Sequence, residues 1–130
     1  MIFDSDVLIW YCRDDPEAIA IINQTPDRAL SIVSMMEVYQ GARSKTDLVY
    51  LRQSLRNLGF RTLHLTEAIG HAALDLIEEH SLTSGLRVED ALIAATALQS
   101  GEVLATGNTR HFAPIRRLAL QPFRPHRRHK

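Results

Sequence analysis

Three acidic side chains in this sequence are placed where they could bind a divalent cation together. Asp4 directly follows a short apolar segment, and Glu37 and Asp90 each lie near the beginning of a helical pattern. Carboxylates about 4 Å apart repel by roughly 4 kcal/mol per pair at an effective dielectric of 20, unless a cation lies between them. Carboxylate oxygens, with no cysteine partner and no histidine pair at ligand spacing, favour Mg²⁺ or Mn²⁺ over Zn²⁺. Such an ion stabilises charge that develops on a phosphodiester and lowers the pKa of bound water.

The elements that must position these acids alternate between short strands and longer helices. Apolar and β-branched runs predict strands at 1–3, 29–33, 62–65, 102–105 and, more weakly, 118–120. Helical patterns cover 7–13, 16–24, 34–42, 45–58, 67–80 and 89–100. Strands that alternate with helices favour right-handed crossovers and a parallel sheet covered on both faces. We therefore predict an α/β fold.

Such a sheet would bring the three acids to one edge. In a parallel α/β sheet, the carboxyl ends of the strands and the amino ends of the following helices share the edge where ligands bind. Asp4 follows the first predicted strand, and Glu37 is expected in the first turn of the helix after the second strand. Asp90 is expected in the first turn of a buried helix, but no predicted strand precedes it directly.

Each acid also has a purely structural explanation. Asp4 could cap the helix that follows it, and Glu37 could complete a capping box with Ser34. Asp90 would be favoured by the helix dipole alone. These explanations account for each residue separately, but not for the predicted convergence of the acids at one edge.

Four further residues could support the site. The Ser5 hydroxyl could orient Asp4 or a bound water, and Asp6 could bind the metal or, as is commoner, cap a helix that begins at residue 7. Thr106 and Asn108 follow the fourth predicted strand and could hydrogen-bond a water or a carboxylate, although both are also common turn formers.

Composition is that of an ordinary globular protein, with 45% hydrophobic and 23% charged residues and no net charge. The segment 124–130 carries four Lys or Arg residues and no acid, so 1–123 has 11 basic and 15 acidic residues. An acidic body argues against binding nucleic acid through a broad positive face. The single Cys12 suits a reducing compartment, and no apolar run approaches the ~18–20 residues of a membrane span. We therefore predict a cytoplasmic protein without membrane association.

Four segments together resemble PIN-domain ribonucleases, and in particular VapC toxins of toxin–antitoxin systems. They are Ile-Phe-Asp-Ser-Asp-Val-Leu-Ile at 2–9, Ser-Met-Met-Glu-Val-Tyr-Gln-Gly at 34–41, Val-Glu-Asp-Ala-Leu-Ile-Ala-Ala-Thr-Ala at 88–97, and Thr-Gly-Asn-Thr-Arg-His-Phe at 106–112. The resemblance implies a five-stranded parallel sheet flanked by helices on both faces. It also implies Mg²⁺- or Mn²⁺-dependent endonucleolytic cleavage of RNA by a PIN domain over 1–123. The basic tail at 124–130 could bind RNA or an acidic partner, or could simply be a flexible terminus.

The same resemblance assigns roles to individual residues. Asp4, Glu37 and Asp90 match the three acids that family members most often retain. The resemblance therefore implies that they are metal ligands and catalytic residues. Asn108 stands where many members carry a fourth acid, and His111 stands at a position that is often acidic. These two departures leave the number of bound metal ions and the level of activity open.

Partners are also implied by the resemblance. The family suggests a homodimer and an antitoxin of the VapB type, which lays a helix or an extended tail into an apolar groove. Trp10, Tyr11 and Tyr39 could line that groove or could belong to the core. The RNA could be a tRNA, a ribosomal RNA or a message, because recognition of single-stranded loops depends on surface shape.

Two other functions fit parts of the sequence. A PIN domain that binds RNA or a partner without cutting it is compatible with Asn108 in place of an acid. The segment 4–8 also looks like the opening of haloacid-dehalogenase-like phosphatases, in which Asp4 would accept phosphate and Asp6 would act as acid and base. The chain lacks the later lysine and the acidic pair that those phosphatases carry.

Overall fold

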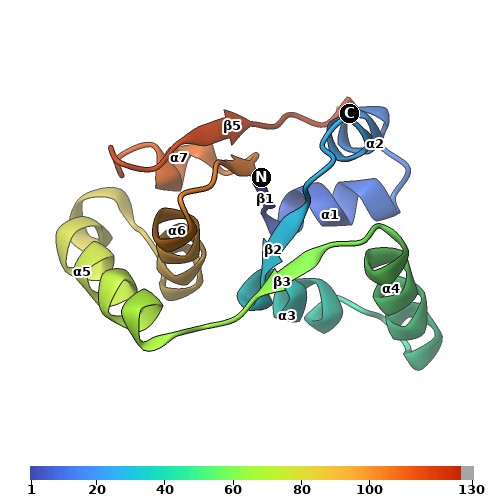
Figure 1. Ribbon diagram of the computed structural model, residues 1–130, viewed down its shortest axis with the longest axis horizontal. Helices are drawn as coiled ribbons and strands as arrows, with labels where there is room; N and C mark the ends of the chain where they lie inside the picture. The colour runs from blue at the N-terminus through green and yellow to red at the C-terminus, as the bar shows by residue number, and fades with distance from the viewer. Residues whose placement is uncertain (127–130) are drawn as a thin grey trace.

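The computed structural model describes residues 1–126, and 127–130 of the predicted tail lie outside the described residues. Within them, five parallel strands form one sheet in the order β3-β2-β1-β4-β5 (Figure 1). The strands are β1 (Ile2–Phe3), β2 (Ala29–Ser31), β3 (Arg61–Leu63), β4 (Leu104–Thr106) and β5 (Leu120–Pro122). The predicted α/β fold with five parallel strands is confirmed.

Helices connect these strands and cover both faces of the sheet. They are α1 (Ser5–Cys12), α2 (Pro16–Asn23), α3 (Ile32–Gln40), α4 (Lys45–Asn57), α5 (Glu67–Ser84), α6 (Val88–Ser100) and α7 (Thr109–Phe112). Six coincide with predicted helices, whereas α7 was not predicted because one helical turn is too short to show periodicity. The helix α5 continues to Ser84 and ends where Gly85 adopts a left-handed conformation, with φ of 73°.

The boundary between β2 and α3 differs from the prediction and affects the site. The strand β2 ends at Ser31, and Ser31 caps α3 by accepting a 3.0 Å hydrogen bond from the Val33 N–H at Oγ. The β-branched residues Ile32 and Val33 resemble a strand in sequence but form the first turn of the helix. Ser34 is therefore buried inside α3, and the predicted capping box between Ser34 and Glu37 does not exist.

Two hydrophobic cores lie on opposite faces of the sheet. Ile2 and Leu104 pack in one core with α5, α6 and α7, and their strand neighbours Phe3 and Ala105 pack in the other with α1, α2 and α4. This alternation follows from the twofold period of a strand. The helix α3 contributes to both cores and contacts α1, α4 and α6, so it lies between the two groups of helices.

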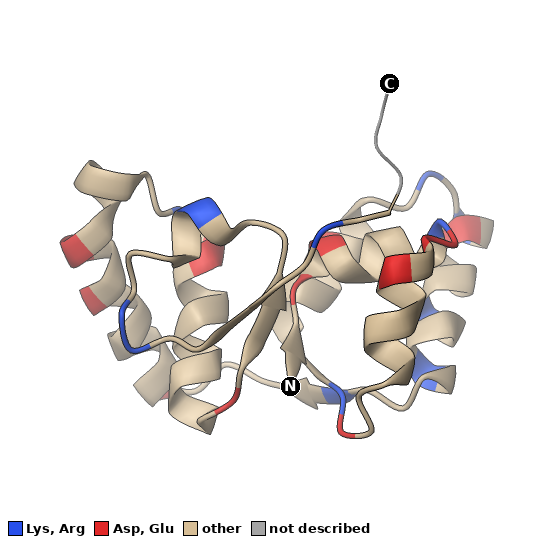
Figure 2. Cartoon of the chain, turned by 90° about the horizontal axis from the view of Figure 1, so that it is seen from above, with Lys and Arg blue, Asp and Glu red and all other residues tan. Residues whose placement is uncertain are grey.

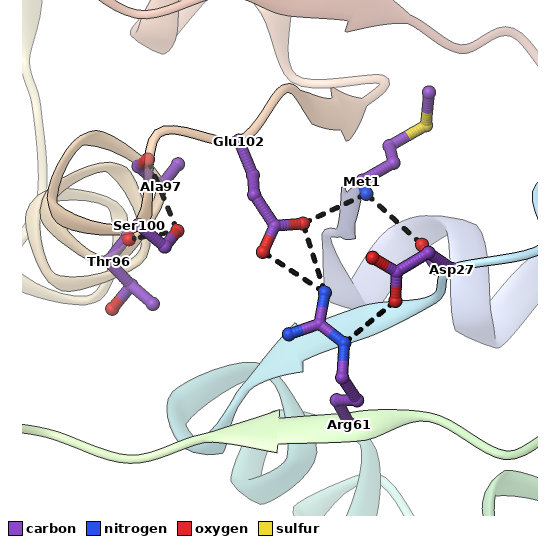
Figure 3. Close-up of polar contacts among 7 residues, drawn as sticks. All are labelled: Met1, Asp27, Arg61, Thr96, Ala97, Ser100 and Glu102. Carbon is purple, nitrogen blue, oxygen red and sulfur yellow. Dashed lines mark hydrogen bonds and ion pairs between the residues drawn. The ribbon is translucent and has the colours of Figure 1, made fainter.

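An ion-pair network connects the amino ends of the strands, at the edge away from Asp4 (Figure 3). The Met1 ammonium donates a 2.9 Å hydrogen bond to Glu102, and Arg61 contacts Asp27 at 2.8 Å and Glu102 at 3.1 Å. These four residues stand at or just before the starts of β1, β2, β3 and β4. Within residues 1–126, no helix combines the length and the apolar character that crossing a bilayer requires.

Candidate active site

Asp4 lies at the junction of β1 and α1, and two hydrogen bonds hold its buried carboxylate. Oδ1 accepts from the Ser5 N–H at 2.8 Å, and Oδ2 accepts from the Thr106 hydroxyl at 2.7 Å. Thr106 is close because β1 and β4 are adjacent parallel strands that end at the same edge. Asp4 is also the N-cap of α1, so capping the helix and facing this edge are compatible roles.

Glu37 reaches the same edge from α3. The Ser5 hydroxyl donates a 2.9 Å hydrogen bond to Oε1 of Glu37, and thereby links the Glu37 carboxylate to the residue that follows Asp4. The sequence predicted Glu37 in the first turn of its helix. Because α3 begins at Ile32, Glu37 lies in the second turn instead. The helix dipole therefore contributes less to Glu37 than expected, and Ser5 is its hydrogen-bond donor instead.

Asp90 lies in the first turn of α6, as predicted, and is 8% exposed. Its Oδ2 accepts from the Arg87 N–H at 3.4 Å and lies 3.2 Å from Nδ1 of His111. The same ring nitrogen lies 3.3 Å from the Asn108 amide nitrogen. Since Asp90 accepts and the Asn108 amide donates, Nδ1 can satisfy only one of them at a time.

Asp6 does not cap α1, because that helix begins at Ser5, two residues before the predicted start, and Asp4 occupies the cap. Its carboxylate accepts hydrogen bonds from the Val7 N–H and the Gly107 N–H, both at 2.8 Å. A Cβ at position 107 would lie 2.6 Å from the Asp6 carboxylate and 3.1 Å from the Phe123 carbonyl oxygen, so any other residue there would displace Asp6 or the backbone. The close approach of these segments ties Asp6 to the end of β4.

These contacts form one connected path along the edge of the sheet. The Asn108 N–H donates to the Thr106 hydroxyl at 2.9 Å. This bond joins the residues around Asp4 to those around Asp90. Figure 2 shows acidic positions, in red, on segments from both groups of helices. Hydrogen bonds link Glu37, Ser5, Asp4, Thr106 and Asn108 in that order. The path reaches Asp90 through His111, whose Nδ1 lies close to both Asn108 and Asp90 but bonds to one of them at a time.

Burial raises the pKa values of three acids at this edge, Asp4, Asp6 and Glu37. Burial, followed by the charge of Asp6, raises the pKa of Asp4 to about 7, against the hydrogen bonds from Thr106 and Ser5. Burial likewise raises the pKa values of Asp6 and Glu37, and the charges of Glu89 and other nearby acids add to the effect on Glu37. The ionised forms are therefore disfavoured here unless positive charge is supplied.

The donor set fits a hard divalent cation bound by few protein ligands. Within residues 1–126, no three His, Cys, Asp or Glu side chains are close enough to hold a metal ion as a group. Mg²⁺ usually retains several waters and is bound by one or two carboxylates together with substrate phosphates. Asp4 meets that requirement because its two hydrogen bonds leave further lone pairs, and Glu37 and Asp90 could bind through water.

Comparison with known proteins identifies the family to which this chain belongs. The sequence profile described as PIN domain matches residues 1–118. The chain belongs to the PIN domain family. The resemblance seen in the sequence is thereby confirmed, while the roles of individual residues in catalysis stay predictions. Comparison with curated protein sequences gives no significant match.

Solved structures agree with the family assignment. A toxin-antitoxin complex from Klebsiella pneumoniae contains a chain that is 28% identical, with a TM-score of 0.77, over 91% of this PIN domain and 94% of that chain. VapBC-1 from nontypeable Haemophilus influenzae matches at 23% identity and a TM-score of 0.74, over 94% and 98% of the two chains. VapBC2 from Rickettsia felis, bound to a promoter DNA fragment, matches at 19% identity and a TM-score of 0.76, over 95% of this chain and 100% of that chain. At these low sequence identities, the last two similarities show a shared fold and nothing more.

Two positions are more closely tied to the site than the sequence suggested. His111 was noted only as a position that is often acidic, and it contacts Asp90 directly. Gly107 had no predicted role, although a glycine directly after a strand is a signal of close backbone approach. Trp10, Tyr11 and Tyr39, for which a shared groove and the core were both open, are partly buried against the core on the α1 face of the sheet. Each of the three borders a different hollow.

Proposed function

We propose that this PIN domain is a metal-dependent endoribonuclease and the toxin of a VapBC-like toxin–antitoxin pair. The observation that carries the proposal is the convergence of Asp4, Glu37 and Asp90 from three elements on one edge, where hydrogen bonds and close polar contacts surround them. PIN domains are generally nucleases, and the solved relatives come from toxin–antitoxin complexes. A cytoplasmic site of action agrees with the single thiol of Cys12.

A divalent cation, Mg²⁺ or Mn²⁺, would supply charge stabilisation for the phosphate and a water of lowered pKa. The residues of the chain would hold and orient it. Asp4 would be the principal ligand, fixed by the Ser5 N–H and the Thr106 hydroxyl. Glu37 and Asp90 would orient water around it, because each has a polar partner on one side and retains free lone pairs.

Raised pKa values support this assignment. A carboxylate with a pKa of about 7 is partly protonated at neutral pH without a cation, and a bound divalent ion would displace that proton. Asp6 would contribute negative charge from beside Asp4, although its oxygens already accept two backbone hydrogen bonds. Metal binding and proton release at this edge would therefore be coupled.

The test is cleavage of RNA by purified protein with Mg²⁺, Mn²⁺ or EDTA. We expect discrete metal-dependent fragments from wild type and a loss of at least about a hundredfold in Asp4→Asn and Asp90→Asn. The control is Asp75→Asn, which removes an exposed acid on α5 outside the hydrogen-bonded path. Equal cleavage by wild type and both site variants would contradict the proposal.

A silent PIN domain that binds RNA or a partner is the second candidate. It is favoured by Asn108, whose amide contacts His111 at the position where an acid would supply a further metal ligand. Folded wild type that binds RNA but leaves it uncut with either metal would support this function. The phosphatase alternative gains no support from the PIN match or from the sheet order.

Assembly with partners is part of the same proposal. An antitoxin of the VapB type is supported by the relatives solved as toxin–antitoxin complexes. A homodimer is supported by exposed apolar side chains on neighbouring helices of the site, Met36 on α3 and Val88 on α6, which are 57% and 65% exposed. Light scattering of wild type and of Met36→Glu would test the dimer, which the substitution should dissociate.

A further inference from the structure

A hollow of about 410 Å³ adjoins the candidate active site, and its lining differs from that of the acidic edge. It is bordered by Asp6 and Gly107, by Trp10 on α1, and by the segment that follows β5. Trp10 is half-buried and presents an indole to this space. The remaining lining is supplied by Thr109, Pro122, Phe123, Arg124 and Pro125.

The hollow is connected to the site by direct contacts. Asp6, on its wall, accepts a hydrogen bond from the Gly107 N–H and lies two residues after Asp4 in α1. The Phe123 N–H donates to the Thr106 carbonyl oxygen at 2.9 Å, which fixes the far wall to the end of β4. The hollow is therefore bordered by the segments that follow Asp4 and Thr106 in the chain.

The charges around the indole favour an anionic chain with planar groups. The Arg13 guanidinium, which borders a neighbouring hollow, lies over the Trp10 ring, 5.4 Å from its centre. Arg124 is exposed and belongs to the lining of this hollow. Aromatic faces bordered by arginines bind single-stranded nucleic acid, because bases stack on the ring and phosphates pair with the guanidinium groups. The Asp6 oxygens retain lone pairs that can accept from an exocyclic amino group of a base.

We propose that this hollow is a subsite for one unpaired nucleotide of the RNA strand, with the base against Trp10 and its phosphate near Arg124. The inference rests on the proposed function, since it concerns the strand that the neighbouring acids would cut. Trp10 and Arg124 are positioning residues in this arrangement. They would hold the strand so that the next phosphate lies at the Asp4 edge.

The start of the tail supports the arrangement. The His126 N–H donates a 2.9 Å hydrogen bond to Asp15, a buried residue that also caps α2. This bond anchors the chain directly after Arg124 and Pro125 and keeps both against the hollow. The described part of the basic segment is thus positioned beside the site by backbone contacts.

Binding can be measured separately from cleavage, because Trp10 is the only tryptophan in the sequence. The probe is a ten-nucleotide oligocytidylate with 2′-O-methyl riboses, which resists cleavage, titrated in EDTA while tryptophan fluorescence is recorded. We expect quenching, with the dissociation constant raised about tenfold by Arg124→Gln. The matched control is Arg117→Gln, which removes an exposed arginine that borders a different hollow and should change affinity little.

Cleavage kinetics give the second readout. Trp10→Ala should raise KM about tenfold and change kcat little, whereas Trp10→Phe, which keeps an aromatic face, should restore KM. Cleavage by wild type without quenching, and with KM unchanged in Trp10→Ala, would overturn the subsite alone. Quenching by RNA without any cleavage would contradict the proposed function and leave the subsite standing. Tighter quenching by an acidic ten-residue peptide than by RNA would overturn the subsite in favour of a protein partner.

Discussion

The Thr106 hydroxyl at the end of β4 donates a 2.7 Å hydrogen bond to the Asp4 carboxylate at the end of β1. This bond joins two residues that are 102 positions apart in sequence and fixes the orientation of the most buried acid of the site. The same hydroxyl accepts from the Asn108 N–H, so its geometry is determined from both sides. Thr106 therefore connects Asp4 to Asn108, which lies on the side of the site that carries Asp90.

Replacing Thr106 with valine should impair the site without changing its shape. Thr106→Val removes the hydrogen bond that lowers the pKa of Asp4, so that pKa should rise further above its ordinary value. Cleavage at neutral pH should fall about tenfold and recover in part at higher pH, where Asp4 is ionised. The measurement is the pH profile of kcat, with Thr106→Ser as the hydroxyl-retaining control. Superimposable profiles for wild type and Thr106→Val would contradict this role.

The metal-free protein should lose stability as the pH rises. Asp4 keeps its proton up to about pH 7 when folded, but loses it near its ordinary pKa of 3.8 when unfolded. Folding therefore takes up a proton between these values, and the free energy of unfolding falls by up to about 1.4 kcal/mol per pH unit in that window. Urea unfolding in EDTA should show this decline, and Asp4→Asn should reduce it. Parallel pH dependence in both proteins would show that Asp4 titrates normally.

His111 should influence the site through Asp90. Its Nδ1 lies 3.2 Å from the Asp90 carboxylate, so His111→Ala leaves that acid with the Arg87 N–H at 3.4 Å as its remaining hydrogen-bond donor among those described. We expect cleavage to fall about tenfold, as for other residues that orient metal ligands. The matched control is His71→Ala, which removes an exposed histidine on α5 whose Nε2 lies 3.8 Å from the Glu67 carboxylate. Equal activity of the two variants would exclude a role for His111.

The ion-pair network at the opposite edge should affect stability but not catalysis. Against the effect of burial, hydrogen bonds from the Met1 ammonium and Arg61 lower the pKa of Glu102. Glu102→Gln should reduce the free energy of unfolding by about 1–2 kcal/mol, because it weakens two charged hydrogen bonds. Glu79→Gln is the control, since Glu79 is exposed and lies 3.9 Å from His80. Loss of RNA cleavage in a folded Glu102→Gln protein would contradict the separation of the two edges.

Much of the fold follows from periodicity in the sequence. Alternating apolar runs predicted all five strands and six helices, and the position of Asp4 directly after a strand predicted its edge of the sheet. The exceptions lie at boundaries. Ile32 and Val33 have strand-like side chains, but the Ser31 cap makes them helical. The helix α7 is a single turn with no period to detect.

The site was harder to predict than the fold, because its geometry depends on contacts between distant segments. Spacing placed Asp4 and Asp90 at helix starts, but it could not show that Ser5 would donate to Glu37 or that His111 would reach Asp90. The pairing of Asp6 with Gly107 requires β4 and α1 to be in place. Such contacts depend on the packing of α3 and α6 across the sheet, which local patterns do not specify.

Binding of Mn²⁺ tests most directly whether these acids form one cation site. The signal of free Mn²⁺ in electron paramagnetic resonance would be followed while wild type, Asp4→Asn and Asp75→Asn are added. Wild type and Asp75→Asn should bind Mn²⁺ alike, and Asp4→Asn should bind at least about tenfold more weakly. Equal binding by all three proteins would contradict a metal site at the Asp4 edge.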